Sequence, residues 1–420
     1  MSTRHKSVGF RHPLRLFLYR FAWTALIVIF SQAMLQVAAA KSPSQSNKQR
    51  NQVIVSPRKG DYPDPIGAAK NAYEGDHWCI SPKLPKHPCV IKILSGIYVL
   101  PETLHVPAGV ALQGVETREV LLLAGRGVSV GVLSEGPLIA DLSIGSDEPN
   151  GIALAFNNKL RRVHVSSAGG GLVDVYLAGV SYTTAVNFDL VDCEIQADGS
   201  AIYSEGASLQ IRSSRLISKL STIYVGYMGE LSIKDSSITM TGDSPDGAIY
   251  ADETQGDIEI IGGTISATYP EGWGSSIELH DMYAVDFIMI GTHVAGDIYL
   301  DGEFGVGNNI LDGVTIKGSF NALSYLSSNT TIRRSLIDAS DSNQPIAIRY
   351  GGDDATRPLE VFGSWIIGET RINDGVLSPG PATFFSTILS GPLVGDRAYL
   401  TCKNVLDANY VDYQNTCPPE

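Results

Sequence analysis

The sequence predicts an all-β solenoid, a right-handed parallel β-helix of about 11 or 12 coils. Three observations predict it. An apolar pattern recurs about every 24 residues between residues 139 and 383. Inside each copy, apolar and polar residues alternate with the period of two that is typical of strands. A second short strand-like segment, usually containing Ile-Tyr, precedes several of the copies.

The repeat consists of two apolar residues at alternate positions, four spacers and a third apolar residue. Clear copies are Leu209-x-Ile211-x4-Leu216, Leu231-x-Ile233-x4-Ile238 and Ile258-x-Ile260-x4-Ile265, and the last and weakest is Thr383-x4-Ile388. The spacers are small and polar, which suits a turn between two short strands. Each coil therefore has at least two strands, and its length leaves room for a third. The apolar anchor residues, Ile260 among them, are expected to form one continuous core.

Composition excludes some classes of protein. The chain has 420 residues, of which 44% are hydrophobic, so it is not disordered throughout. It has 31 basic and 44 acidic side chains, a formal net charge of −13. This balance argues against a body that binds nucleic acid.

The N-terminus resembles an export signal. Basic residues in positions 1–20 precede the uncharged run Phe21 to Phe30, and Ala38-Ala39-Ala40 supplies small residues before Lys41. We expect residues 1–40 to be a signal peptide and residues 41–61 a polar linker. A retained single-pass anchor is the alternative, because residues 21–40 could span a bilayer. The expected location is outside the cell or in the periplasm, with no membrane contact after signal removal.

The cysteines agree with export. Cys79 and Cys89 are close in sequence, as are Cys402 and Cys417, so each pair is expected to form a local disulfide in an oxidising compartment. Cys193 is then left as a buried thiol on an inward-facing strand position. The predicted β-helix domain covers residues 62–395. Residues 396–420 form a C-terminal cap, and Asp64-Pro65 begins a short helix that covers the N-terminal end.

One segment resembles a known superfamily. Val90-Ile91-Lys92-Ile93-Leu94-Ser95-Gly96-Ile97-Tyr98-Val99, which leads to Val106-Pro107-Ala108-Gly109-Val110-Ala111-Leu112-Gln113-Gly114, is similar to the first coils of pectin-lyase-like right-handed β-helix proteins. The resemblance covers about residues 62–395. It implies the fold but no single activity, since the superfamily includes lyases, hydrolases, esterases, phage tailspikes and non-catalytic surface proteins.

No complete catalytic motif of a named enzyme family is present. Asp353-Asp354 lacks the partners found in polygalacturonases, and Leu279-His280-Asp281 matches only the end of a pectate-lyase strand. Val285-Asp286-Phe287-Ile288 resembles a pectinesterase strand that carries a catalytic aspartate, without that family's companion motifs.

The candidate site comes from the alternation of the Ile-Tyr strands. If Ile points inward, one outward column contains Tyr203, Tyr224, Tyr250, Glu278 and Tyr299, and the other contains Glu205, Gly226, Asp252, His280 and Asp301. We take Glu278, Asp252, Asp301 and His280 as candidate catalytic residues. Tyr250, Tyr299, Tyr224 and Arg349 are the candidate substrate-binding residues, and Arg349 with Tyr350, Asp353 and Asp354 would extend the same face.

Several interpretations of this face stay open. The tyrosines could simply stack to stabilise the sheet. They could bind a polysaccharide without chemistry, or the carboxylates could act as the acid and base of a polysaccharide lyase or glycoside hydrolase. Asp252, Glu253, Asp281 and Asp301 could hold Ca²⁺, and the sequence indicates no other cofactor. The two function classes are a secreted glycan-binding or surface-structural protein and a polysaccharide-degrading enzyme.

Overall fold

The structure is a computed structural model of the whole chain. It describes residues 51–72, 78–79, 89–125, 130–132, 138–146, 150–154, 158–174, 186–226, 229–242, 244, 246–267, 275–281, 285–302, 307–324, 329–341, 345–352, 358–372, 380–413 and 416–418. These residues belong to one compact unit that spans residues 47–420. The predicted signal peptide lies outside the described residues. None of the described helices is long and apolar enough to cross a membrane.

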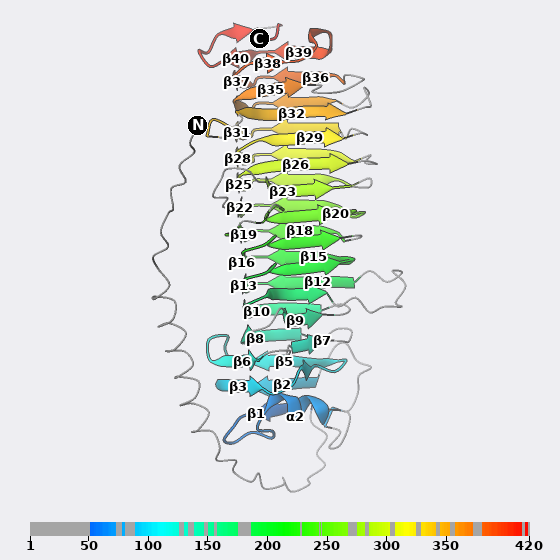
Figure 1. Cartoon of the computed structure of the whole chain (residues 1–420), viewed down its shortest axis with the longest axis vertical. Coiled ribbons are helices and arrows are strands. Elements are labelled where there is room, and N and C mark those ends of the chain that lie inside the picture. The colour runs from blue at the N-terminus through cyan, green and yellow to red at the C-terminus, as the bar shows by residue number, and fades with distance from the viewer. Residues whose placement is uncertain are drawn as a thin grey trace, which may run out of the picture. The chain divides into compact units, whose positions relative to one another are not determined.

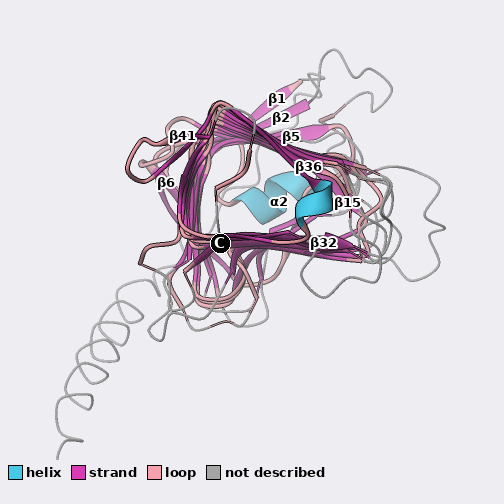
Figure 2. Ribbon diagram, turned by 90° about the horizontal axis from the view of Figure 1, so that it is seen from above, coloured by secondary structure: helices cyan, strands magenta, loops and turns pink. Residues whose placement is uncertain are grey.

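The unit is a right-handed parallel β-helix, as the sequence predicts. Successive coils stack along one axis (Figure 1), and each coil contributes strands to three faces that enclose the core (Figure 2). Faces 1 and 2 together form a sheet of 28 strands among the described residues, because β8 and β10 bend through the corner between them. Face 3 is a separate sheet of 13 described strands.

Face 1 contains β1 (Gln52–Val55), β2 (Cys89–Ile93), β5 (Val110–Gly114), the first parts of β8 (Leu138–Ser146) and β10 (Asn158–Ser167), β12 (Val186–Val191), β15 (Ala207–Arg212), β18 (Leu231–Lys234), β21 (Ile258–Ile261), β24 (Phe287–Ile290), β27 (Asn308–Asp312), β30 (Asn329–Arg333), β33 (Leu359–Phe362), β36 (Ala382–Phe385) and β39 (Leu400–Lys403). Face 2 contains β3 (Gly96–Leu100), β6 (Val120–Ala124), the second parts of β8 and β10, β13 (Glu194–Ala197), β16 (Arg215–Ser218), β19 (Ser237–Met240), β22 (Thr264–Ala267), β25 (His293–Ala295), β28 (Thr315–Lys317), β31 (Leu336–Asp338), β34 (Trp365–Ile367), β37 (Ile388–Ser390) and β40 (Val405–Asp407).

Face 3 contains β4 (Leu104–His105), β7 (Val130–Val132), β9 (Asn150–Leu154), β11 (Gly170–Asp174), β14 (Ile202–Glu205), β17 (Ile223–Gly226), β20 (Ile249–Asp252), β23 (Ser275–His280), β26 (Asp297–Gly302), β29 (Phe320–Ser324), β32 (Ile346–Gly352), β35 (Glu369–Ile372) and β38 (Leu393–Val394). The strands of each face pair in parallel with those of the next coil. The third strand that the coil length allowed is therefore present.

The repeat anchors form the core in the predicted register. Ile211, Ile233, Ile260 and Met289 are partners on adjacent strands of face 1, and each is at most 1% exposed. Face 3 adds a matching inner column that includes Ile249. The alternation of apolar and polar residues places the next side chain of every strand outside.

The corner between faces 1 and 2 is built by residues in the left-handed conformation. Asp192, Ser213, Asp235 and Gly262 have φ values of 54°, 49°, 49° and 66°. Glycine and short polar residues suit this corner because they adopt positive φ at low cost, although Arg162 and Arg334 also have a φ of 51° at equivalent turns. A serine follows at several corners: the amide of Cys193 donates to Ser214 Oγ at 3.1 Å, and the amide of Ser214 donates to Ser236 Oγ at 3.1 Å.

The two ends of the stack carry different elements. Helix α2 (Pro65–Lys70) begins at Asp64, whose side chain accepts a hydrogen bond from Gly67 N at 2.7 Å, and the helix lies across the N-terminal opening (Figure 2). The Cys79–Cys89 and Cys402–Cys417 disulfides form as predicted. At the other end, the 3₁₀ helix η1 (Arg397–Tyr399) precedes β39, and β41 (Asp412–Tyr413) pairs antiparallel with β40.

The stack extends beyond residues 62–395 at both ends. β1 lies in the segment expected as a linker and pairs with β2, while β39 and β40 lie in the segment expected as a cap and pair with β36 and β37. The register predicted for the last repeat is wrong by one residue. Phe384, rather than Thr383, is the partner of Val361, and it is fully buried. Ala382 and Phe384 are the inward residues of β36, so their burial fixes which face of this strand is inside.

Candidate functional site

An aromatic column runs along the outside of face 3. Tyr203, Tyr224 and Tyr250 are partners on β14, β17 and β20. Glu278 on β23 and Tyr299 on β26 continue the same register. All five side chains are half-buried and alternate with the buried inner residues of their strands. The outward column predicted from the sequence is therefore correct in register.

The rings of the column form a continuous stack. The Tyr203 and Tyr224 ring centroids are 4.6 Å apart with an interplanar angle of 7°, and those of Tyr224 and Tyr250 are 5.4 Å apart at 16°. Glu278 occupies the next backbone position, but the His280 ring fills the gap. Its centroid lies 5.5 Å from Tyr250 and 5.7 Å from Tyr299, in tilted contacts. We call these five rings the aromatic ladder.

Glu278 holds the His280 ring in the aromatic ladder. Nε2 of His280 and Oε1 of Glu278 are 2.7 Å apart and form a hydrogen bond, and the two side chains are 27% and 20% exposed. A second pair of the same i, i+2 type joins Tyr203 to Glu205 through the tyrosine hydroxyl. The aromatic ladder thus contains one acid–base pair that remains accessible to solvent.

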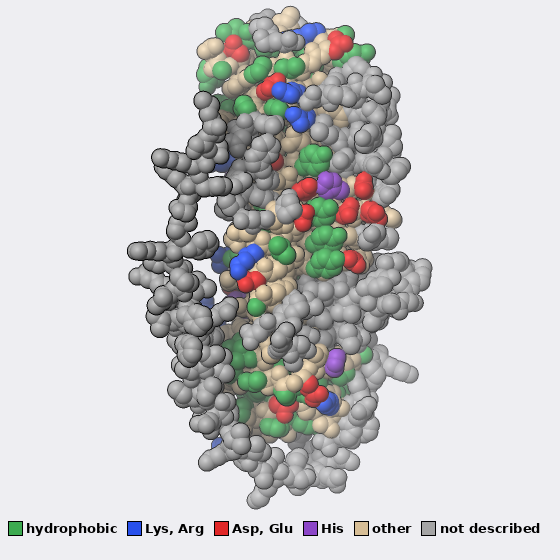
Figure 3. Space-filling view, in the orientation of Figure 1, with side chains coloured by type: hydrophobic (Ala, Val, Ile, Leu, Met, Phe, Trp, Pro, Cys, Tyr) green, Lys and Arg blue, Asp and Glu red, His purple; other side chains and the backbone are tan. Residues whose placement is uncertain are grey.

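Acidic side chains surround the middle of the aromatic ladder. Figure 3 shows a vertical line of hydrophobic and histidine side chains with acidic side chains on both sides of it. Burial raises the pKa of Tyr250 to about 12, and the negative charges of Asp252, Asp246 and Glu278 add to the shift. The Tyr250 hydroxyl is therefore protonated at neutral pH and can donate and accept hydrogen bonds.

The structure brings most of the predicted site residues together. Asp252 ends β20 and is the register partner of His280. The backbone of Asp301 lies in β26, and its side chain lies outside the described part of the molecule. Arg349 lies on the same face, two strands beyond Tyr299, because Asn321 is the partner of both.

The extension of the site through Tyr350 is wrong. Tyr350 follows Arg349 in β32, so its side chain points inward, and it is only 3% exposed. Asp353 and Asp354 lie outside the described residues.

The carboxylate of Asp286, in the segment that resembles a pectinesterase strand, accepts hydrogen bonds from the backbone amide and the side-chain amide of Asn308, at 2.8 and 2.9 Å.

Two further expectations from the sequence concern a Ca²⁺ site and the buried thiol of Cys193. Within the described residues, no three His, Cys, Asp or Glu side chains are arranged to hold a metal ion. Cys193 is a buried free thiol, as expected, but it lies in the corner turn before β13 rather than in a strand. Burial raises its pKa to about 11, so at neutral pH it is a protonated thiol.

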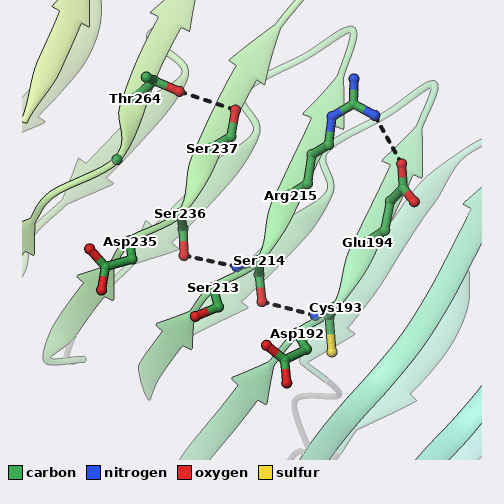
Figure 4. A pocket seen from close by; sticks show the side chains of 11 residues that line it. Asp192, Cys193, Glu194, Ser213, Ser214, Arg215, Asp235, Ser236, Ser237 and Thr264 are labelled. Carbon is green, nitrogen blue, oxygen red and sulfur yellow. Dashed lines mark hydrogen bonds and ion pairs between the residues drawn. The ribbon is translucent and has the colours of Figure 1, made fainter.

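Sequence reasoning missed a groove on the opposite side of the coils. It follows the corner between faces 1 and 2, has a volume of about 470 Å³ and is lined by polar side chains (Figure 4). Those side chains belong to the corner serines and their neighbours, including Asp192, Asp235 and the ion pair of Arg215 with Glu194 at 3.0 Å. The sequence signal for this groove is the polar spacer of each repeat, which predicts a turn but not the groove that the stacked turns form.

Comparisons with known proteins give a fold-level similarity only. No family model and no curated protein matches the sequence. Among solved structures, the catalytic domain of a GH87 alpha-1,3-glucanase in complex with tetrasaccharides is similar over 86% of this chain and 70% of its own, at 12% identity and a TM-score of 0.44. The A-module of the mannuronan C-5 epimerase AlgE6 of Azotobacter vinelandii is similar over 84% of this chain and 94% of its own, at 11% identity and a TM-score of 0.34. These values assign no role to any residue of this chain.

Proposed function

We propose that the protein binds an extracellular polysaccharide along face 3, over the aromatic ladder. The observation that carries the proposal is the Glu278–His280 pair. A tyrosine at position 278 would continue the stack of its neighbours, so folding alone requires no acid there. Instead the chain places a hydrogen-bonded carboxylate and imidazole among the tyrosine rings, where both side chains remain partly exposed to solvent.

The geometry of the aromatic ladder suits a long polar ligand. Because the tyrosine rings cover one another's faces, they present their edges and hydroxyl groups outward. These hydroxyls and the adjacent carboxylates can donate to and accept from sugar hydroxyls, while the ring edges exclude water. Coils recur about every 4.8 Å, which is close to the length of one sugar ring in an extended chain. A polysaccharide parallel to the axis would therefore meet similar groups at each coil.

Secretion belongs to the same proposal. Two disulfides are typical of proteins that fold in an oxidising compartment. We therefore place the protein in the periplasm or outside the cell, where a polysaccharide partner would be available.

The experiment is a binding assay of the mature protein on a panel of neutral, acidic and amino-sugar polysaccharides. The double variant Tyr250→Ala/Glu278→Gln should lose at least tenfold in affinity, about 1.4 kcal/mol, while its melting remains cooperative. The matched control is Trp365→Ala/Glu360→Gln, which removes an exposed aromatic and an acid from faces 1 and 2. Its affinity should equal that of the wild type.

Two results would count against the proposal. Unchanged binding by the folded Tyr250→Ala/Glu278→Gln variant would eliminate face 3 as the site. Absence of binding by the wild type to every polysaccharide would favour the view that the aromatic ladder only stabilises the sheet.

Polysaccharide cleavage is a second candidate, and the Glu278–His280 hydrogen bond is the observation that favours it. A carboxylate that orients an imidazole is an arrangement used for general acid–base catalysis. The same polysaccharide panel can be assayed for new reducing ends, which a hydrolase produces, and for unsaturated ends, which a lyase produces. A catalytic role for the pair requires that His280→Ala abolish such products while binding is retained.

A further inference from the structure

The charge of the ligand can be inferred from how acidic residues are paired on the three faces. This inference rests on the proposed polysaccharide-binding function of face 3. The five strands that carry the aromatic ladder, β14, β17, β20, β23 and β26, contain no lysine or arginine. They contain Glu205, Asp252 and Glu278 among their outward residues, and Glu253 and Asp281 follow directly after β20 and β23.

On the other faces of the same coils, several acids are paired with a base. Asp189 pairs with Arg212 at 2.6 Å, Glu194 with Arg215 at 3.0 Å, and Glu259 with Lys234 at 3.0 Å. Each of these ion pairs links one coil to its neighbour, so the acid of one strand lies beside the base of another. Sequence and register thus pair these three acids with a base of the adjacent coil.

Face 3 lacks this compensation around the aromatic ladder. Among the ion pairs between described residues, none joins a lysine or arginine to Asp252, Glu253 or Asp281. All three are half-buried, and the Asp252 backbone is the partner of His280, directly before Asp281. Acidic side chains therefore lie along the continuous ring column (Figure 3), and three of them have no lysine or arginine paired to them among the described residues.

We propose that the aromatic ladder takes a cationic glycan, a polymer of amino sugars with free amino groups. A sugar ammonium group donates three hydrogen bonds, and the half-buried carboxylates and tyrosine oxygens beside the ladder are acceptors. A face with several uncompensated carboxylates also concentrates cations near it and repels a polymer of uronic acids. The aromatic edges supply contact area, and the carboxylates select the charge.

The length of the binding region follows from the same column. It runs from Tyr203 to Tyr299, which is four coil spacings or about 19 Å. Beyond it lie Asn321 and then Arg349, whose partner on the next strand is Arg371. Arg371 is paired with Glu369 at 2.9 Å, so the limit of the binding region is set by the end of the ring column at Tyr299. Affinity should stop rising at about four or five sugars.

The test compares two oligosaccharides of equal length that differ only in acetylation: a glucosamine hexamer with free amines and an N-acetylglucosamine hexamer. A galacturonic acid hexamer serves as the anionic probe. Binding is measured by calorimetry at about pH 6, where aspartate and glutamate are ionised, in EDTA so that no divalent cation can bridge two carboxylates. We expect the free-amine hexamer to bind at least tenfold more tightly than the acetylated one, with affinity falling as salt is raised.

Two variants test which residues determine the preference for the free-amine hexamer. Asp252→Asn/Glu253→Gln should reduce the preference for the free-amine hexamer several-fold. Glu259→Gln removes an acid of the same coil that is paired with Lys234, and it should leave the preference unchanged.

The outcomes separate this inference from the proposed function. Equal binding of free-amine and acetylated hexamers, or tighter binding of the galacturonic acid hexamer, would overturn the cationic assignment while leaving face 3 as a glycan site. A preference that survives in the folded Asp252→Asn/Glu253→Gln variant would also overturn it. Failure of all three hexamers and of the whole polysaccharide panel would instead overturn the proposed function.

Discussion

The variant Ile260→Asp is expected to prevent folding of the β-helix. Ile260 lies in the middle of the stack, is fully buried and is in register with Ile233 and Met289. A carboxylate at this position would be surrounded by apolar side chains without a partner. The cost should exceed about 5 kcal/mol, which is comparable to the stability of many whole domains. The expected result is insoluble protein, or loss of the cooperative transition in circular dichroism.

The matched control is the next residue of the same strand. Ile261 points outward and is the partner of Lys234 on one side and Ile290 on the other. Ile261→Asp should remain soluble and melt cooperatively, because its carboxylate would lie in solvent beside a lysine. A soluble, cooperatively folding Ile260→Asp protein would mean that the strand register is wrong.

Among glycine-to-alanine substitutions in the corner between faces 1 and 2, Gly263→Ala should lower the stability of the protein most. Gly263 has a φ of +75°, and a Cβ there would lie 2.0 Å from the carbonyl oxygen of Ser236. That oxygen accepts a hydrogen bond from Thr264 N at 2.9 Å, so it cannot move without breaking the ladder between β19 and β22. We expect a loss of about 3 kcal/mol or more in the free energy of unfolding, measured by denaturant titration.

Gly291→Ala separates the steric clash from backbone strain. Gly291 has a φ of +61°, but a Cβ there would have no heavy atom within 4 Å. Its cost should therefore be only the left-handed penalty of about 1–2 kcal/mol. Equal losses for the two variants would show that the close approach at Gly263 does not determine the corner geometry.

The sequence predicts the stack well because its signal is repeated. Each coil alternates apolar and polar residues, and burial of one side fixes both the register and the outward side chains. The Tyr203–Tyr224–Tyr250 column follows directly from this alternation. The same rule fails in the last repeat, where Phe384 and Thr383 are adjacent and both fit a strand. Only packing against Val361 decides which of them points inward.

The details of the site depend on side-chain conformations that the sequence pattern does not contain. Alternation places Glu278 in the column, but it cannot show that the ring of His280 leans across to fill the gap. That position depends on the hydrogen bond to Glu278 and on the contacts with Tyr250 and Tyr299. The corner groove was missed for a similar reason, because a turn sequence says nothing about the shape that successive turns form when they stack.

The most direct test of face 3 as the glycan site is a crystal structure determined after crystals of the protein are soaked in an oligosaccharide that it binds. The account predicts density for the sugar chain along β14, β17, β20, β23 and β26, in contact with Tyr250 and the Glu278–His280 pair. Density in the corner groove beside Asp192 and Asp235, with face 3 empty, would contradict it.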